Sequence, residues 1–94
     1  MAKGYFLSAH RSLANPEKRQ AYLELAEPAI IKAGGKVLAS TNAIESRENG
    51  ASQQTVLIEF ESFEAAVSAY ESPDYQKALA ALDGGADRDV RIFE

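Results

Sequence analysis

The chain has 94 residues, 46% hydrophobic and 26% charged, so we expect one globular domain covering residues 1–94. Its net charge is −4, and its lysines and arginines are scattered, which argues against nucleic acid and anionic membranes as partners. The sequence has no cysteine, which excludes disulfides, Cys-ligated zinc and iron–sulfur clusters, and its single histidine argues against a metal cage. We therefore expect neither a metal nor a cofactor.

No apolar segment is long enough to span a membrane, and the first residues lack the pattern of a secretory leader. We therefore expect a cytoplasmic protein. A chain of this length buries only about 60 to 65% of its unfolded surface. A partner subunit that covers part of the core is therefore expected.

The first predicted strand covers residues 3–11. Side chains alternate between the two faces of a strand, and here both faces begin with apolar bulk. One face carries Tyr5, Leu7 and Ala9, and the other carries Phe6, Ser8 and His10.

A helix is predicted from Pro16 to about Ala33, with Asn15 as its N-cap and Pro16 at its first position. Gly34 and Gly35 end it. Pro28 lies inside the helix and predicts a bend, because proline removes one backbone hydrogen bond. By their spacing, the residues expected to be buried are Tyr22, Leu25, Ala26, Ala29 and Ala33.

Two further strands are predicted at residues 36–46 and 54–61, joined by a polar loop in which Asn49-Gly50 is a hairpin signal. The second of these strands has the strongest β pattern of the chain. Val56, Ile58 and Phe60 share one of its faces, and Leu57 and Glu59 share the other.

Ser72-Pro73 interrupts the helical pattern that follows, because a residue before proline avoids the α region. Ser72 is expected to cap a second helix at once, redirected toward the sheet edge or the rim of a barrel. A last strand is predicted at residues 90–94. The apolar stripes of the two helices are Phe63, Ala66, Val67 and Tyr70, then Tyr75, Ala78, Leu79 and Leu82.

The resulting order is βαββαβ, which predicts a ferredoxin-like α+β fold. Its four-stranded antiparallel sheet has the helices on one face and the first and third strands in the centre. Because the strands are apolar on both faces, the second face also needs cover. We expect a homodimer through that sheet face, with the two sheets forming a barrel.

Several segments resemble the family called domain of unknown function 1330, in order and spacing: "KGYFLSAH", "NPEKRQAYLELAEPAIIKAGGKVLA" and "VLIEFESFEAAVSAYESPDYQKALAAL". The resemblance implies a dimeric α+β barrel with a small-molecule cleft in each protomer, and it implies no activity. The chain departs from the family at Asp83, where Arg is frequent, and at Ala39-Ser40, where an Arg-Gly pair is common. No anion-binding role is carried over to those positions.

His10 and Glu59 are the candidate catalytic residues. His10 titrates near neutral pH and serves either as a general base or as a hydrogen-bonded histidine at a strand end. Glu59 is expected to point away from the helices toward the dimer cavity, where a carboxylate needs donors. Arg91 is its candidate partner, and an ion pair that specifies dimer geometry is the alternative to catalysis.

Tyr22, Tyr70, Tyr75 and Arg91 are the candidate ligand-binding residues. For the tyrosines, packing in the core with the hydroxyl at a polar rim is the alternative. Ser72 has no triad around it, and neither the Gly34-Gly35 pair nor the Gly84-Gly85 pair forms a phosphate loop.

Three functions are compatible with this pattern, and the sequence does not decide whether the protein is an enzyme. The first is an enzyme or binder of a small molecule, in a cleft between sheet and helices that contains Glu59, His10 and a tyrosine hydroxyl. The second is a non-catalytic dimeric accessory or regulatory module. The third, an RNA-recognition domain, is disfavoured because the chain is acidic and "TVLIEFE" lacks the basic residue, glycine and stacking aromatics of that module.

Overall fold

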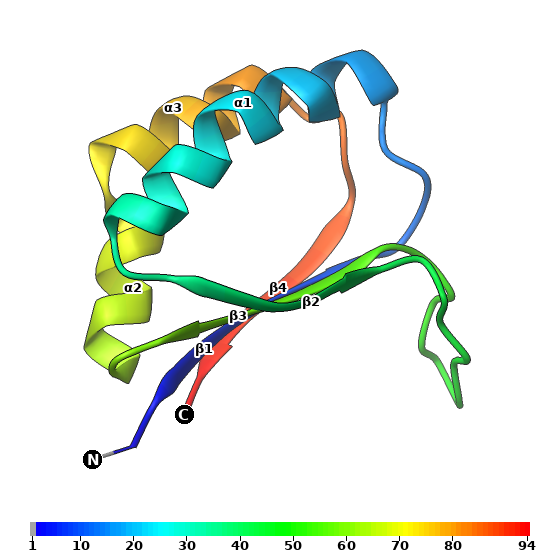
Figure 1. The fold of residues 1–94 in the computed structure, drawn as a ribbon. Coiled ribbons are helices and arrows are strands. Elements are labelled where there is room, and N and C mark those ends of the chain that lie inside the picture. The colour runs from blue at the N-terminus through cyan, green and yellow to red at the C-terminus, as the bar shows by residue number, and fades with distance from the viewer. Residues whose placement is uncertain (1) are drawn as a thin grey trace.

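The four strands form one antiparallel sheet in the order β2-β3-β1-β4, and the three helices lie on one face of it (Figure 1). The computed structural model describes residues 2–94. It confirms the predicted ferredoxin-like α+β fold, with the first and third strands in the centre. The elements are β1 (Gly4–His10), α1 (Pro16–Lys32), β2 (Lys36–Thr41), β3 (Thr55–Phe60), α2 (Phe63–Glu71), α3 (Pro73–Leu82) and β4 (Arg88–Phe93).

Strand β1 separates the two faces of the sheet. Phe6 lies opposite Ile58 of β3 and Ile92 of β4, and these residues face the helices and build the core. Because side chains alternate along a strand, their neighbours in sequence point to the face that the helices leave uncovered, which we call the open face. It carries Tyr5, Leu7, Leu57, Glu59, Asp89, Arg91 and Phe93.

Helix α1 begins and ends where the sequence predicts. The Asn15 side chain accepts a hydrogen bond from the Lys18 amide at 3.0 Å, and Gly34 after the helix has a positive φ of 86°. The predicted buried stripe is only partly correct: Ala26 and Ala29 are buried, but Leu25 is 44% exposed and Ala33 is exposed.

The reason for that difference is the rotation of the helix about its axis. Ile30 is buried with Ala26 and Ala29, and Tyr22 and Leu23 are partly buried. These positions form one line along the helix, and Leu25 lies beside it. Ala33 follows the last helical residue, Lys32, as the C-cap.

The chain turns sharply at Ser72-Pro73. The Ser72 hydroxyl accepts from the Tyr75 amide at 3.2 Å and donates to the Ala69 carbonyl at 2.8 Å, so one side chain ends α2 and begins α3. Helix α2 then packs on β1, β3 and β4, whereas α3 runs beside α1 (Figure 1). The break therefore directs the second helix onto its neighbouring helix.

Helix α1 packs mainly against α3. It crosses over the sheet and is separated from it (Figure 1). A cavity of about 360 Å³ lies between α1 and the helix-facing side of the sheet. The arrangement of the helices thus leaves room for a site next to the core.

Two strand boundaries differ from the prediction by two residues or more. Strand β2 ends at Thr41 rather than at residue 46, and residues 42–54 form a longer connection to β3. Within it, the Gly50 amide bonds the Arg47 carbonyl at 3.0 Å, so the Asn49-Gly50 signal marks a turn inside the loop. Strand β4 starts at Arg88, before the predicted residue 90. Along residues 2–94, no helix has the length and apolar character to cross a membrane.

Candidate functional site

The cavity has apolar walls and one polar end. Leu23, Ala26 and Ile30 of α1 form one wall, and Val56 and Ile58 of β3 form the opposite one. The polar side chains gather where β1 ends and α1 begins: Ser8, His10, Arg19, Tyr22 and Arg88. An apolar cavity with a few converging polar groups is the usual form of a small-molecule site.

His10 is buried at this polar end, with 6% of its surface exposed. Its ring nitrogens make no hydrogen bond within residues 2–94, although its side chain lines the cavity. Burial lowers the pKa of His10, and the positive charges of Arg88 and Arg19 lower it further. The imidazole is therefore neutral at pH 7 and keeps a lone pair free to accept a proton or a hydrogen bond.

Arg88 is the cross-strand neighbour of His10. Its Nη1 donates to Tyr22 Oη at 3.2 Å and to Ser8 Oγ at 3.3 Å, and the guanidinium lies over the Tyr22 ring at 5.0 Å from the centroid. Burial acts to lower the pKa of Arg88, but Tyr22 and Tyr75 outweigh it and raise the pKa above its usual value. The guanidinium is therefore charged, and neutral groups hold it in place.

Only one of the three candidate tyrosines lines the cavity. Tyr22 does, and its hydroxyl lies 2.6 Å from that of Tyr75, which is fully buried behind it. Burial, together with the neighbouring Tyr22, raises the pKa of Tyr75 far above its usual value, so this hydroxyl stays protonated. Tyr70 packs against Phe6 and Tyr75, with ring centroids 5.7 and 5.1 Å apart, and is not part of the cavity wall.

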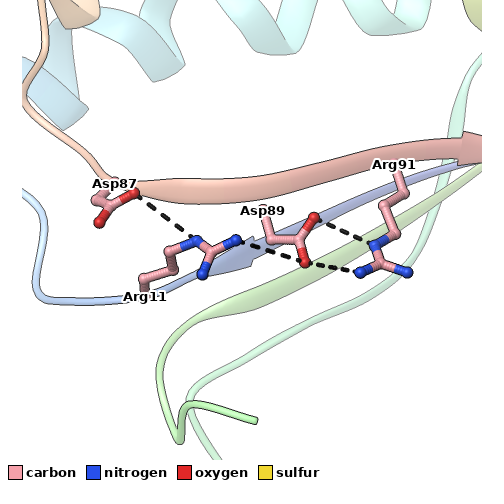
Figure 2. Close-up of polar contacts among 4 residues, drawn as sticks. All are labelled: Arg11, Asp87, Asp89 and Arg91. Atoms are coloured by element: carbon pink, nitrogen blue, oxygen red, sulfur yellow. Dashed lines mark hydrogen bonds and ion pairs between the residues drawn. The ribbon is translucent and has the colours of Figure 1, made fainter. Parts of the chain in front are cut away.

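Glu59 and Arg91 lie on the open face, away from the cavity. Glu59 stands opposite Tyr5 of β1 and Lys36 of β2. Since His10 points to the other face, the structure separates the two candidate catalytic residues, and the expected cleft containing both does not form. Within the chain, Arg91 pairs with Asp89 rather than with Glu59: its Nε and Nη2 each lie 3.2 Å from an Asp89 oxygen (Figure 2).

The sequence matches the family described as "Domain of unknown function (DUF1330)" over residues 3–94. The chain belongs to this family. Comparison with curated proteins finds no match.

Solved structures show that the DUF1330 chain shares its fold with several proteins. The RPA0582 protein of unknown function from Rhodopseudomonas palustris is 19% identical, with a TM-score of 0.72 over 97% of this chain and 80% of that chain. SnoaB, described as a cofactor-independent oxygenase from Streptomyces nogalater, is 15% identical, with a TM-score of 0.65 over 100% and 93%. A putative antibiotic biosynthesis monooxygenase from Nitrosomonas europaea is 12% identical, with a TM-score of 0.60 over 99% and 97%.

Sequence reasoning missed Arg88, Ser8 and Arg19 as site residues of this DUF1330 chain. The predicted last strand begins at residue 90 and leaves Arg88 outside it. Arg88 lies two residues before Val90, which faces the helices as Ile92 does. Because side chains alternate along a strand, this spacing predicts that Arg88 lies on the cavity side.

The open face of the DUF1330 chain combines an apolar part with a charged row. Tyr5 and Phe93 stack with their ring centroids 5.6 Å apart. The row continues from Arg91 and Asp89 to Arg11, which lies 4.0 Å from Asp89 and 3.9 Å from Asp87 (Figure 2). The hydrogen bond from Arg91 lowers the pKa of Asp89, so this carboxylate is ionised at pH 7.

Proposed function

We propose that this DUF1330 domain binds a small organic molecule in the cavity between α1 and the sheet, and that His10 acts on this molecule as a general base. One observation carries the proposal. His10, Arg88 and Tyr22 come from three different elements and converge on the polar end of an apolar cavity of about 360 Å³. Packing alone does not require polar groups to gather at a space of this size.

The three groups have complementary chemistry. A neutral His10 can accept a proton from a hydroxyl or an activated C–H of the ligand. Arg88 has N–H groups that are free to donate to a ligand, because only its Nη1 makes a hydrogen bond in the described part of the chain. Together with the Tyr22 hydroxyl, it would stabilise the negative charge that remains on the ligand oxygen after proton transfer.

The fold is compatible with such chemistry. SnoaB is described as a cofactor-independent oxygenase. We infer by analogy of fold alone that a domain of this shape can act on a small molecule with its own side chains.

A blocked cavity tests the proposal. Ala26 is buried in the cavity wall, so Ala26→Phe should fill the space, whereas Ala21→Phe places the same ring on the exposed side of α1. We expect ligand-observed NMR of a panel of small aromatic and aliphatic hydroxy and carbonyl compounds to detect binders of the wild type. Those binders should be lost with Ala26→Phe and kept with Ala21→Phe.

Two results would count against a ligand site in this cavity. One is a panel in which nothing binds the wild type. The other is a set of binders that Ala26→Phe leaves unaffected while circular dichroism shows that this variant is folded.

We also propose that the chain forms a homodimer through its open face. Helices do not cover this face, and its apolar side chains include the stacked Tyr5 and Phe93 together with Leu7 and Leu57. An apolar sheet face of this kind favours a second copy as its cover. The same observation supports the second candidate function, a non-catalytic dimeric accessory or regulatory module. That module would form the dimer but bind no small molecule.

A further inference from the structure

The arginines of the chain fall into two groups. Arg11, Arg47 and Arg91 each pair with an aspartate or glutamate at the surface. Arg19 and Arg88 make no ion pair with any of residues 2–94, and both line the cavity. In a chain with a net charge of −4, the arginines without an acidic partner are thus the ones that face the cavity.

The surroundings of Arg88 do not neutralise its charge. Its hydrogen-bond acceptors are the hydroxyls of Ser8 and Tyr22, which are neutral, and its strand neighbour His10 is neutral at pH 7. Glu27 of α1 also lines the cavity, but it is exposed and lies beyond ion-pair distance of either arginine. A partly buried cation is costly unless an anion accompanies it.

We infer that the ligand of the cavity is an organic monoanion, a carboxylate or an enolate, whose charged group lies between Arg88 and Arg19. This inference rests on the proposed function, since it names the ligand class of the same site. The guanidinium of Arg88 supplies a planar pair of donors that fits the two oxygens of a carboxylate. The apolar body of the ligand lies against Ile30, Val56 and Ile58.

The volume of the cavity limits the size of the ligand. About 360 Å³ is near the lower end of the range for small-molecule sites, so a bicyclic ring or a chain of comparable bulk fits. Apart from Glu27 of α1 and Ser40 of β2, the polar lining residues gather at one end of the cavity, which favours a ligand with a single charged group.

A matched pair of probes tests the charge preference directly. 2-Naphthoate and 2-naphthamide have nearly the same shape and differ in charge. We expect isothermal titration calorimetry at pH 7.5 to give a dissociation constant at least about tenfold lower for the naphthoate, as hydrogen bonds to a charged group require.

Substitutions of single arginines test which side chains cause the preference for the charged probe. The ratio to compare is the dissociation constant of the naphthamide divided by that of the naphthoate. Arg88→Met should reduce this ratio to about one, since the guanidinium donors are lost while a long side chain remains. Arg19→Met should lower the ratio without removing it. Arg47→Met is the matched control, because Arg47 pairs with Glu45 on the surface at 3.0 Å, and its ratio should equal that of the wild type.

Each outcome separates the inference from the proposed function. If the wild type binds both probes equally well, the inference is overturned and the small-molecule site stands. If it binds neither probe, both are overturned for ligands of this size. If Arg88→Met does not fold, the wild-type ratio together with Arg19→Met still decides, and an unchanged ratio in Arg19→Met would remove Arg19 from the anion site.

Discussion

His10 is the residue whose environment the structure defines most sharply. It is buried beside two cations, Arg88 and Arg19, and its ring nitrogens have no partner among the described residues. Protonation would place a third positive charge at the polar end of the cavity. A histidine in this position is therefore neutral rather than an ion-pair partner.

We predict that the pKa of His10 in the folded protein lies below 6.5, the value for an unperturbed histidine. Below pH 6.5 the unfolded chain then binds a proton that the folded chain does not, so stability falls as the pH falls through this region. Above pH 6.5 His10 is neutral in both the folded and the unfolded chain, so it no longer makes stability depend on pH. NMR titration of the imidazole measures the pKa.

Urea denaturation between pH 7.5 and 5.5 measures the consequence for stability. His10→Gln should remove most of the pH dependence in this range, because the carboxylates titrate mainly at lower pH. A pKa at or above 6.5 would contradict the description of the site.

At the scale of the elements, the break at Ser72-Pro73 decides where the cavity lies. Helix α2 packs on the sheet, and α3 turns to run beside α1. Because α1 has its extensive packing with α3, it stands away from the sheet, and the space beneath it becomes the cavity.

Ser72→Ala tests how much the shared cap contributes. The Ser72 hydroxyl satisfies the Tyr75 amide and the Ala69 carbonyl, so its removal should lower the free energy of unfolding by about 1 to 2 kcal/mol. Ser68→Ala, at an exposed position of α2, should change it by less than about 0.5 kcal/mol. Equal effects of the two substitutions in chemical denaturation would show that the Ser72 cap is not needed.

The sequence predicted the elements well and the site only in part, for reasons visible at this scale. Caps such as Asn15 and Ser72 act locally, so helix starts follow from a few neighbouring residues. Strand alternation defines the two faces of each strand by itself, but the sequence hypothesis put His10 and Glu59 in one cleft. The face that forms the cavity depends on how α1 rotates and how far it stands from the sheet. The environment of Arg88 could not be predicted from local sequence, because its hydrogen-bond partners, Tyr22 and Ser8, lie far away in the sequence.

In the whole molecule, the two faces of the sheet carry different features. The helix side contains the cavity. The open face contains the apolar residues and the charged row, which Figure 2 shows. A dimer through the open face would cover the apolar residues without closing the cavity of either protomer.

We predict a dimer at micromolar concentration by light scattering, and a monomer for Leu57→Glu, which places a charge on the open face between the two sheets. Leu13→Glu is the matched control: Leu13 is 87% exposed in the loop before α1, and this variant should remain a dimer. A wild-type monomer at micromolar concentration would contradict the dimer and leave the cavity proposal intact.

We propose that the ligand binds on the helix side of the sheet. The most direct test is a map of amide and side-chain NMR shift changes when 2-naphthoate is added to the labelled protein. A ligand in the cavity should change the shifts of His10, Arg88 and Tyr22, with little change at Leu57 and Phe93 on the open face. Changes confined to the open face, or none at saturating probe, would contradict it.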